Sequence, residues 1–255
     1  MVIERCVKIG STEYTVVLSD ETDSLLAAAA AGKAVIGLWN PDRPEVSLFP
    51  ARYVVERPED ADTAYLERAV RRHLGLPLII GQSERLMIRE FTMEDCRFVP
   101  LEEEAGEDDA LFRSPELLHA YIKNQYEFFE YGIWAVVRAE DGVLLGKAGI
   151  SPLPASGPLQ LQESGSDYPA AELSYHIFRP FRRQGFALEA CRLILSYARA
   201  HVTPDIFIRI MPDNRPSARL AGRLGFSPAR GALSSNEESP DGAPVYYCCQ
   251  AGSEP

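Results

Sequence analysis

A strand, a basic turn and a helix follow one another in the second half of the chain, and together they could bind a phosphorylated ligand. The apolar run 173–178 is typical of a strand, Pro180 ends it, and the turn 182–187 opens a helix. The first amides of a helix lack intrahelical acceptors and carry partial positive charge, so they attract anions. Gly185 lets an anion approach the backbone because it has no Cβ. The pattern predicts an anion site; an ordinary turn with solvated arginines is the alternative.

The composition is that of a soluble globular protein with one large domain or two modest ones. The chain has 255 residues, of which 46% are apolar and 25% charged. Its net charge of −11 disfavours nucleic-acid partners and favours cationic ones. No run approaches the roughly 20 apolar residues that span a bilayer, and no signal-peptide layout opens the chain. Five cysteines, without metal-like spacing apart from adjacent Cys248 and Cys249, indicate reduced thiols in the cytoplasm.

Residues 1–82 predict a small α/β domain. Apolar runs at 14–18, 34–39 and 52–56 indicate strands, and the stretches 24–31 and 58–75 indicate helices. Strand, helix, strand, strand and helix in this order suggest a Rossmann-like unit ahead of the main domain. Nothing in these residues indicates the role of this unit.

Two segments of this first domain resemble the haloacid-dehalogenase-type fold. VVLSD at 16–20 places an aspartate at a strand end before an alanine-rich helix, and AVIG at 34–37 gives the next strand. The resemblance covers the tail half of that fold, and the family's aspartate nucleophile motif is absent. Asp20 and Asp23 are therefore expected to cap the helix rather than bind a metal, and no phosphatase activity is predicted.

Residues 83–255 predict a second, larger domain. Strands at 133–138 and 143–150 flank an Asp-Gly turn, which is typical of a hairpin. A helical stripe runs over 115–131, and the long loop 152–169 is rich in Pro, Gly, Ser and Gln. The other expected strands are 85–90, 171–178, 206–211 and 245–250, and the other expected helices begin near 186 and 218.

Three short motifs in this second domain follow one another in a distinctive order. AELSYH at 171–176 precedes R-x-x-G-x-A at 182–187, and NRPS at 214–217 precedes LGF at 224–226. This order resembles the GNAT superfamily of N-acetyltransferases, and within it the ribosomal-protein alanine and serine acetyltransferases. The resemblance implies an α/β GNAT fold, in which helices flank a mixed, mostly antiparallel central sheet.

The resemblance also implies acetyl-CoA as co-substrate. In the family, the turn at 182–187 cradles the pyrophosphate through its amides, which agrees with the anion site expected from the residues alone. The preceding strand end pairs with the pantetheine arm as an added strand would. Asn214 either contacts this arm or caps the next helix, and the two roles are compatible. The residues assigned to the coenzyme are Ile177, Phe178, Arg179, Arg182, Arg183, Gln184, Gly185, Phe186, Ala187, Asn214 and Ser217.

Two catalytic roles near the coenzyme sulfur follow from the resemblance. Ser217 matches a serine whose hydroxyl lies near that sulfur; a first-turn serine that satisfies a backbone amide is the alternative. Relatives often carry a general-acid tyrosine where this chain has Ala221, so return of a proton to the sulfur falls to Ser217 or to water. The amides near Ile177 and Phe178 would stabilise the oxyanion.

Glu172 is the candidate general base. Relatives have a strand carboxylate here that accepts the amine's proton through water, and burying a carboxylate is costly unless it is paired or functional. Alternation places Glu172, Ser174 and His176 on one strand face, so a wet channel could run along it. A salt bridge from Glu172 to a neighbouring arginine is the alternative. His176 is expected to be a hydrogen-bonded core residue rather than a base.

These assignments predict an enzyme that moves acetyl from acetyl-CoA to a primary amine by direct attack, without a metal or a covalent enzyme intermediate. The acidic stretch 102–109 and the loop 152–169 are expected to flank the amine, which favours a peptide N-terminus or a small cationic amine. A non-catalytic module that binds coenzyme A as a sensor or scaffold is the alternative. The sequence neither names the acceptor nor distinguishes a monomer from a homodimer.

Overall fold

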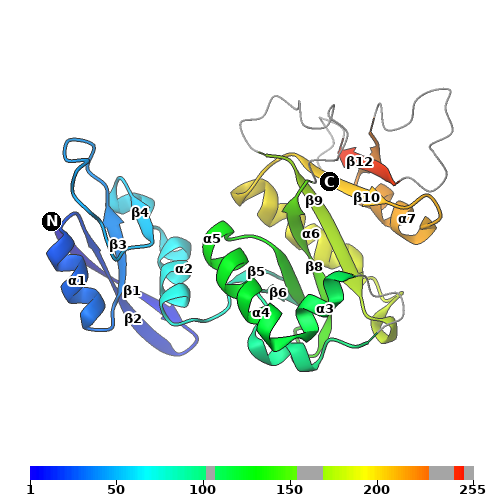
Figure 1. Cartoon of the computed structure of the whole chain (residues 1–255), viewed down its shortest axis with the longest axis horizontal. Helices are drawn as coiled ribbons and strands as arrows, with labels where there is room; N and C mark the ends of the chain where they lie inside the picture. Colours follow the sequence, from blue (N-terminus) through cyan, green and yellow to red (C-terminus); the bar gives the residue numbers. More distant parts are fainter. Residues whose placement is uncertain (102–106, 154–168, 230–243, 250–255) are drawn as a thin grey trace. The chain divides into compact units, whose positions relative to one another are not determined.

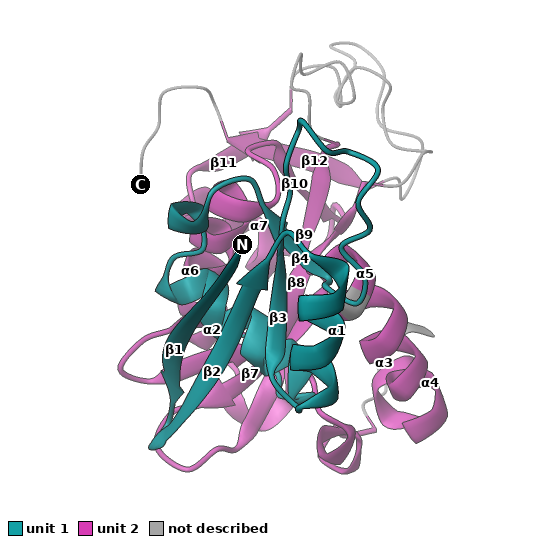
Figure 2. Ribbon diagram, turned by 90° about the vertical axis from the view of Figure 1, so that its left-hand side faces the viewer, with its two compact units in different colours: residues 1–78 teal, residues 79–255 magenta. Residues whose placement is uncertain are grey.

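The chain folds into two compact units, Met1–Leu78 and Ile79–Pro255 (Figures 1 and 2). The structure is a computed structural model, and it describes residues 1–101, 107–153, 169–229 and 244–249. Strand β5 (Ile79–Gln82) pairs with β6 (Leu86–Arg89) in the sheet of the second unit. Residues 79–82 therefore belong to unit 2, whereas the sequence analysis places them at the end of the first domain.

Unit 1 is an α/β unit, as expected, built on a four-stranded sheet in the order β1-β2-β3-β4. β1 and β2 form an antiparallel hairpin, and β2, β3 and β4 run parallel. Its elements are β1 (Val2–Ile9), β2 (Thr12–Ser19), α1 (Thr22–Ala30), β3 (Ala34–Leu38), β4 (Tyr53–Val55), the 3₁₀ turn η1 (Pro58–Asp60) and α2 (Thr63–His73).

The sequence analysis does not predict β1. Every second residue of this strand faces the interior, but Arg5 occupies one of these positions between Ile3 and Val7 and is half-buried. The arginine interrupts the apolar alternation by which a strand is recognised. Pairing with β2 along its whole length is what makes the segment a strand.

The two helices of unit 1 begin differently. Asp62 caps α2, because its Oδ1 accepts a hydrogen bond from the amide of Tyr65 at 2.8 Å. Asp20 does not cap α1 as predicted: Glu21 is the N-cap residue, without a side-chain bond, and Asp20 accepts a hydrogen bond from the amino group of Met1. The core of the unit includes buried residues of the sheet, of α2 and of the segment between η1 and α2: Val7, Val16, Leu18, Ala34, Ile36, Leu38, Val55, Ala61, Leu66, Ala69 and Val70.

Unit 2 is built on an eight-stranded sheet in the order β11-β12-β10-β9-β8-β7-β6-β5. β9 and β10 run parallel and the other neighbours are antiparallel, which confirms the expected mixed, mostly antiparallel sheet. The remaining strands are β7 (Ile133–Arg138), β8 (Leu144–Pro152), β9 (Ala171–Ile177), β10 (Ile206–Ile210), β11 (Phe226–Pro228) and β12 (Val245–Cys249).

Helices flank this sheet. The long helix α6 packs against β5, β6, β8 and β9, and α7 packs against β10 and β11. In the described part of the chain, no helix is both long and apolar enough to cross a membrane. The helical segments of unit 2 are η2 (Met93–Arg97), α3 (Glu107–Arg113), α4 (Pro115–Tyr121), η3 (Ile122–Tyr126), α5 (Glu127–Phe129), η5 (Arg179–Phe181), α6 (Phe186–His201) and α7 (Arg215–Arg223).

The helix predicted over 115–131 contains a π-helical stretch, η3, between α4 and α5. Two tyrosines of this region hold the start of β7: the Tyr121 hydroxyl accepts from the amide of Ile133 at 2.7 Å, and the Tyr126 hydroxyl donates to its carbonyl. Tyr126 also accepts from the amide of Phe91 at 3.3 Å. Local residue patterns do not reveal these tertiary hydrogen bonds, so the sequence predicts only an uninterrupted helical stripe.

The parallel pair β9–β10 opens toward the end of β9. Registered pairing joins Ala171 and Glu172 of β9 to Ile206 and Phe207 of β10. The rest of β9, through Ile177, keeps its partner β8 on the other edge. The edge of β9 that faces β10 therefore opens where the strand runs into the basic turn.

Candidate active site

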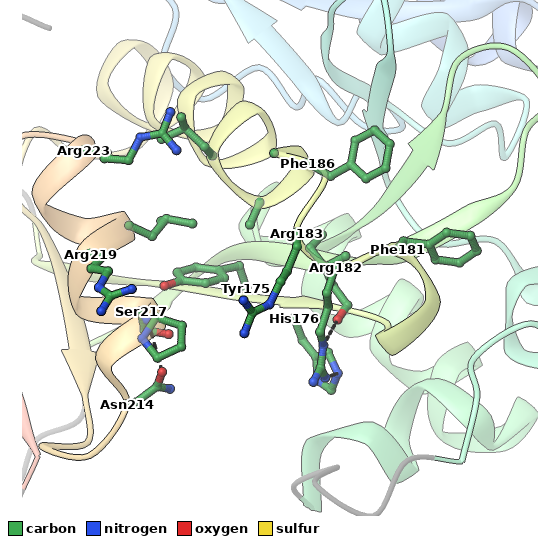
Figure 3. A pocket seen from close by; sticks show the side chains of 16 residues that line it. Tyr175, His176, Phe181, Arg182, Arg183, Phe186, Asn214, Ser217, Arg219 and Arg223 are labelled. Carbon is green, nitrogen blue, oxygen red and sulfur yellow. Dashed lines mark hydrogen bonds between the residues drawn. The ribbon is translucent and has the colours of Figure 1, made fainter.

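A cavity of about 850 Å³ lies at this opening (Figure 3). Three elements line it: the end of β9, the turn with the first residues of α6, and α7. Of the residues assigned to the coenzyme, the cavity brings together Ile177, Arg182, Arg183, Gly185, Phe186, Ala187, Asn214 and Ser217. Phe178, Arg179 and Gln184 are not among the residues that line it.

The turn at the start of α6 exposes backbone amides to the cavity. Arg183 and Gly185 have left-handed φ angles of +62° and +85°, and Gly185 is the N-cap residue of α6. Glu189 donates to the carbonyl of Gly185, so the amides of residues 186–188 precede the first intrahelical hydrogen bond. A left-handed residue in such a turn directs neighbouring amides toward a common point, which favours an anion. The local structure thus agrees with the anion site predicted from the sequence.

Arginines from two elements add positive charge to the cavity. Arg183 comes from the turn, and Arg219 and Arg223 come from α7 (Figure 3). The two α7 arginines are not among the residues predicted from the sequence. Their spacing of four residues, which puts them on one helix face, was the available signal.

Arg182 lines the cavity and also stabilises the end of β9 through hydrogen bonds. Its Nε donates to the carbonyl of Ile177 at 2.8 Å, and its Nη2 donates to Nε2 of His176 at 3.1 Å. His176 is hydrogen-bonded, as expected, but it is half-buried and lines the cavity rather than lying in the core. The arginine and the histidine together join the turn to the last residues of β9.

Arg85, from the segment before β6, braces the turn from outside. Its Nη1 donates to the carbonyl of Gln184 at 3.2 Å, and its guanidinium lies 4.9 Å from the ring centroid of Phe186. It also forms an ion pair with Glu189 of α6, whose other oxygen accepts from the Ser83 hydroxyl at 2.5 Å. Sequence analysis misses this brace because Arg85 and Glu189 are 104 positions apart.

Ser217 and Asn214 sit together at the start of α7. Asn214 caps the helix, because its Oδ1 accepts from the amide of Ser217 at 3.1 Å. The Ser217 side chain faces the cavity, opposite Tyr175 of β9 (Figure 3). The capping role that the sequence suggests for Asn214 is confirmed.

Tyr175 is a cavity residue that the sequence analysis does not single out. Its hydroxyl is buried and makes no hydrogen bond of ordinary geometry with the described residues. Burial raises the pKa of Tyr175 to about 12, and the neighbouring Ser217 hydroxyl opposes this shift in part. The only signal in the sequence was strand alternation, which places Tyr175 and Ile177 on the same face.

Glu172 lies on the other face of β9. The residue is 8% exposed, and its carboxylate forms an ion pair with Arg209 of β10, with 3.2 Å between Nε and Oε1. It is not among the residues that line the cavity. The salt bridge given above as the alternative role of Glu172 is therefore present.

One predicted oxyanion donor is wrong. The amide of Phe178 donates to the carbonyl of Leu145 at 2.9 Å and is not available to a ligand. Amides of an edge strand alternate between its two sides, and the amide of Ala171 donates toward β10, to Asp205, at 2.9 Å. By the same alternation, the amides of Tyr175 and Ile177 point to the open edge.

The segments expected to flank the acceptor lie largely outside the described residues. These segments are the acidic stretch, of which 107–109 belong to α3, and most of the loop 152–169. Among the residues that the structure describes, no group of three or more His, Cys, Asp or Glu is arranged to hold a metal ion.

Comparison with known proteins identifies the family. Residues 52–227 match the family model described as "Acetyltransferase (GNAT) domain". The chain belongs to the GNAT acetyltransferases. The matched residues begin within unit 1 and extend through the motifs at the cavity.

The chain is similar to solved structures of acetyltransferases. A protein from Bordetella pertussis assigned to this family is 20% identical, with a TM-score of 0.51 over 68% of this chain and 99% of its own. An acetyltransferase from Agrobacterium tumefaciens is 20% identical, with a TM-score of 0.45 over 68% and 94%. A ribosomal-protein-S5-alanine acetyltransferase from Vibrio fischeri is 15% identical, with a TM-score of 0.46 over 70% and 100%.

The cavity fits the acetyl donor that GNAT enzymes use, acetyl-CoA. The amides of residues 186–188 and the side chain of Arg183 suit a pyrophosphate, and Arg219 and Arg223 add positive charge nearby. The open edge of β9 offers backbone groups to an extended arm. Ser217, at the start of α7, lines the same cavity. The residues that line the cavity are therefore compatible with acetyl-CoA.

Proposed function

We propose that this GNAT enzyme transfers an acetyl group from acetyl-CoA to a primary amine by direct attack. One observation carries the proposal: the anion-binding turn opens directly onto the unpaired edge of β9, with hydroxyl groups beside it. A phosphate site alone would serve many ligands. A phosphate site continuous with a strand edge suits a ligand whose phosphates continue into an amide-bearing arm.

The chain's own groups supply binding and orientation. Acetyl-CoA, when bound, supplies an acetyl thioester; the amine nitrogen bonds to the acetyl carbon, the C–S bond breaks, and the sulfur keeps the electron pair. The amide of Ile177, on the open edge of β9, is the proposed donor to the acetyl oxygen. Ser217 is the proposed donor to the sulfur.

Removal of the amine's proton is assigned to Glu172 acting through water. The carboxylate is held by Arg209 on the face of β9 away from the cavity, so direct contact with the amine is not part of the proposal. A positioned base typically contributes about 10²- to 10⁴-fold to such a step. Water that relays the proton would also connect the amine to solvent.

The proposed acceptor is a peptide N-terminus or a small cationic amine. The motif similarity to ribosomal-protein acetyltransferases and the net charge of −11 support a cationic acceptor. The five cysteines are all unpaired thiols, which supports a reducing compartment such as the cytoplasm.

A two-part experiment tests the proposal. Acetyl-CoA should raise the melting temperature, because a ligand that binds only the folded state stabilises it. A screen of peptide N-termini, polyamines and neutral amines should then give free thiol with at least one acceptor, and added salt should slow the cationic ones. Stabilisation without thiol release from any amine would favour a coenzyme A sensor, the alternative suggested by Ala221. No stabilisation would refute the cofactor assignment.

A further inference from the structure

Tyr175 carries a polar group without a structural use in the described protein. Its hydroxyl is buried, and no hydrogen-bond partner of ordinary geometry exists for it among the described residues. Leaving such a group unsatisfied costs free energy, and native proteins seldom do so without a reason. The neighbouring Ser217 hydroxyl interacts with it electrostatically but does not complete a hydrogen bond.

The position of this hydroxyl suggests what it binds. Tyr175 extends from β9 and Ser217 from α7, and the two side chains lie next to each other in the wall of the cavity (Figure 3). Two residues further along β9, the amide of Ile177 points to the open edge of the strand.

We propose that the Tyr175 hydroxyl donates a hydrogen bond to the sulfur of acetyl-CoA and acts there as a catalytic residue together with Ser217. The proposal rests on the proposed function. It assigns to a residue of β9 the place on the sulfur that relatives fill with a tyrosine from the helix, where this chain has Ala221. Ala221 is fully buried and has no polar side chain to offer.

The hydrogen bond stabilises charge and does not transfer the proton. As the C–S bond breaks, the sulfur takes the electron pair, and two hydroxyl donors lower the energy of the resulting thiolate. Burial keeps the pKa of Tyr175 at about 12, well above the ordinary thiol value of about 8.5. Tyr175 therefore retains its proton. The amine releases one proton through water to Glu172, which passes it to solvent, and the sulfur takes one proton from solvent, so the reaction balances.

Tyr175→Phe tests this role because it removes only the hydroxyl. We expect kcat to fall about 10- to 100-fold, the range for a hydrogen bond to a charged group. The Kd of acetyl-CoA should change less than about twofold, since the hydroxyl acts on the thiolate and not on the thioester. The melting temperature without ligand should stay the same or rise, because the lost hydroxyl has no partner in the protein.

Tyr126→Phe is the matched control. The same substitution there removes a buried hydroxyl that makes two hydrogen bonds, so the melting temperature should fall. If Tyr175→Phe behaves like this control, with a lower melting temperature and unchanged kcat, Tyr175 is a structural residue and the proposal fails.

Binding of coenzyme A gives a second readout that is independent of turnover. Two donors on the sulfur should lower the pKa of the thiol of bound coenzyme A. This pKa, measured from the absorbance of the thiolate, should therefore be higher in Tyr175→Phe and in Ser217→Ala than in the wild type. Equal pKa values in Tyr175→Phe and the wild type overturn the proposal. If the wild type turns over and Tyr175→Phe has the same kcat, the role of Tyr175 is refuted and the proposed function stands. If the wild type does not bind the coenzyme, the proposed function is refuted as well.

Discussion

The two faces of β9 use their polar groups in opposite ways. Glu172, on one face, is buried and paired with Arg209. Tyr175, on the other, is buried at its hydroxyl but has no partner of ordinary geometry in the described protein, and it lies in the cavity. A polar group that is satisfied within the protein contributes to stability, whereas one that is left unsatisfied is available to a ligand. Loss of the partner on the first face should therefore reduce stability, and substitutions around the cavity should act mainly on function.

Arg209→Met should give the largest change, a loss of about 2–3 kcal/mol in the free energy of unfolding. The substitution leaves the Glu172 carboxylate buried without its counter-ion, and an uncompensated buried charge is costly. Urea denaturation at neutral pH measures the loss. Because the Arg209 side chain is about half exposed, Glu172→Gln should cost less, about 1 kcal/mol.

The same pair of variants tests whether the Glu172 face of β9 contributes to stability, to turnover or to both. If Glu172 is also the base, Glu172→Gln should lose turnover mainly at neutral pH and recover as the pH rises, because the amine then loses its proton without help. Unchanged stability in Arg209→Met would show that this face is not held by the ion pair.

Gly185→Ala should cost about 1 kcal/mol of stability and weaken acetyl-CoA binding about tenfold. The φ angle of +85° strains an alanine, while its Cβ would meet only Arg85 Nη2, at 3.6 Å. The strain would shift the turn, and the amides of residues 186–188 would move away from the anion. Gly142→Ala is the matched control, with a φ of +73° and open space around its Cβ. It should lose similar stability in the same thermal scans and keep the wild-type Kd.

Alkaline pH should reveal the buried Tyr175 hydroxyl. Its pKa is about 12 in the folded protein and about 10 in the unfolded chain. The unfolded state therefore loses its proton first, so the stabilising contribution is complete below pH 10 and disappears as the pH rises to 12. The wild type should lose about 1 kcal/mol more than Tyr175→Phe over this window, by denaturation at fixed pH. Parallel profiles would contradict burial of the hydroxyl.

Arg85→Ala should have the smallest effect on stability, below about 1 kcal/mol, because its ion pair with Glu189 is partly exposed. The brace on the carbonyl of Gln184 is lost, so the Kd of acetyl-CoA should rise about three- to tenfold while kcat changes little. Arg57→Ala, which removes the exposed pair with Asp60 in unit 1, should leave the Kd unchanged. Equal Kd values in the two variants would show that the turn holds its shape without Arg85.

The sequence predicts those parts of the site that depend on short stretches of chain. The glycine at the start of α6, the cap formed by Asn214 and the apolar run of β9 each follow from neighbouring residues, and the structure has all three. β1 is not recognised, because Arg5 interrupts its alternation. β5 is placed in the wrong domain, because pairing with β6 decides where it belongs.

By itself, then, the sequence determined the glycine-containing turn at the start of α6 and the family, since both depend on residue types at fixed local spacing. Only the tertiary structure decided which polar groups are paired. Glu172 meets Arg209 from another strand, Arg85 reaches the turn from 99 residues away at Gln184, and Tyr175 faces Ser217 from a different element. The order of the strands and the opening between β9 and β10 bring these residues together, and no local sequence pattern predicts these contacts.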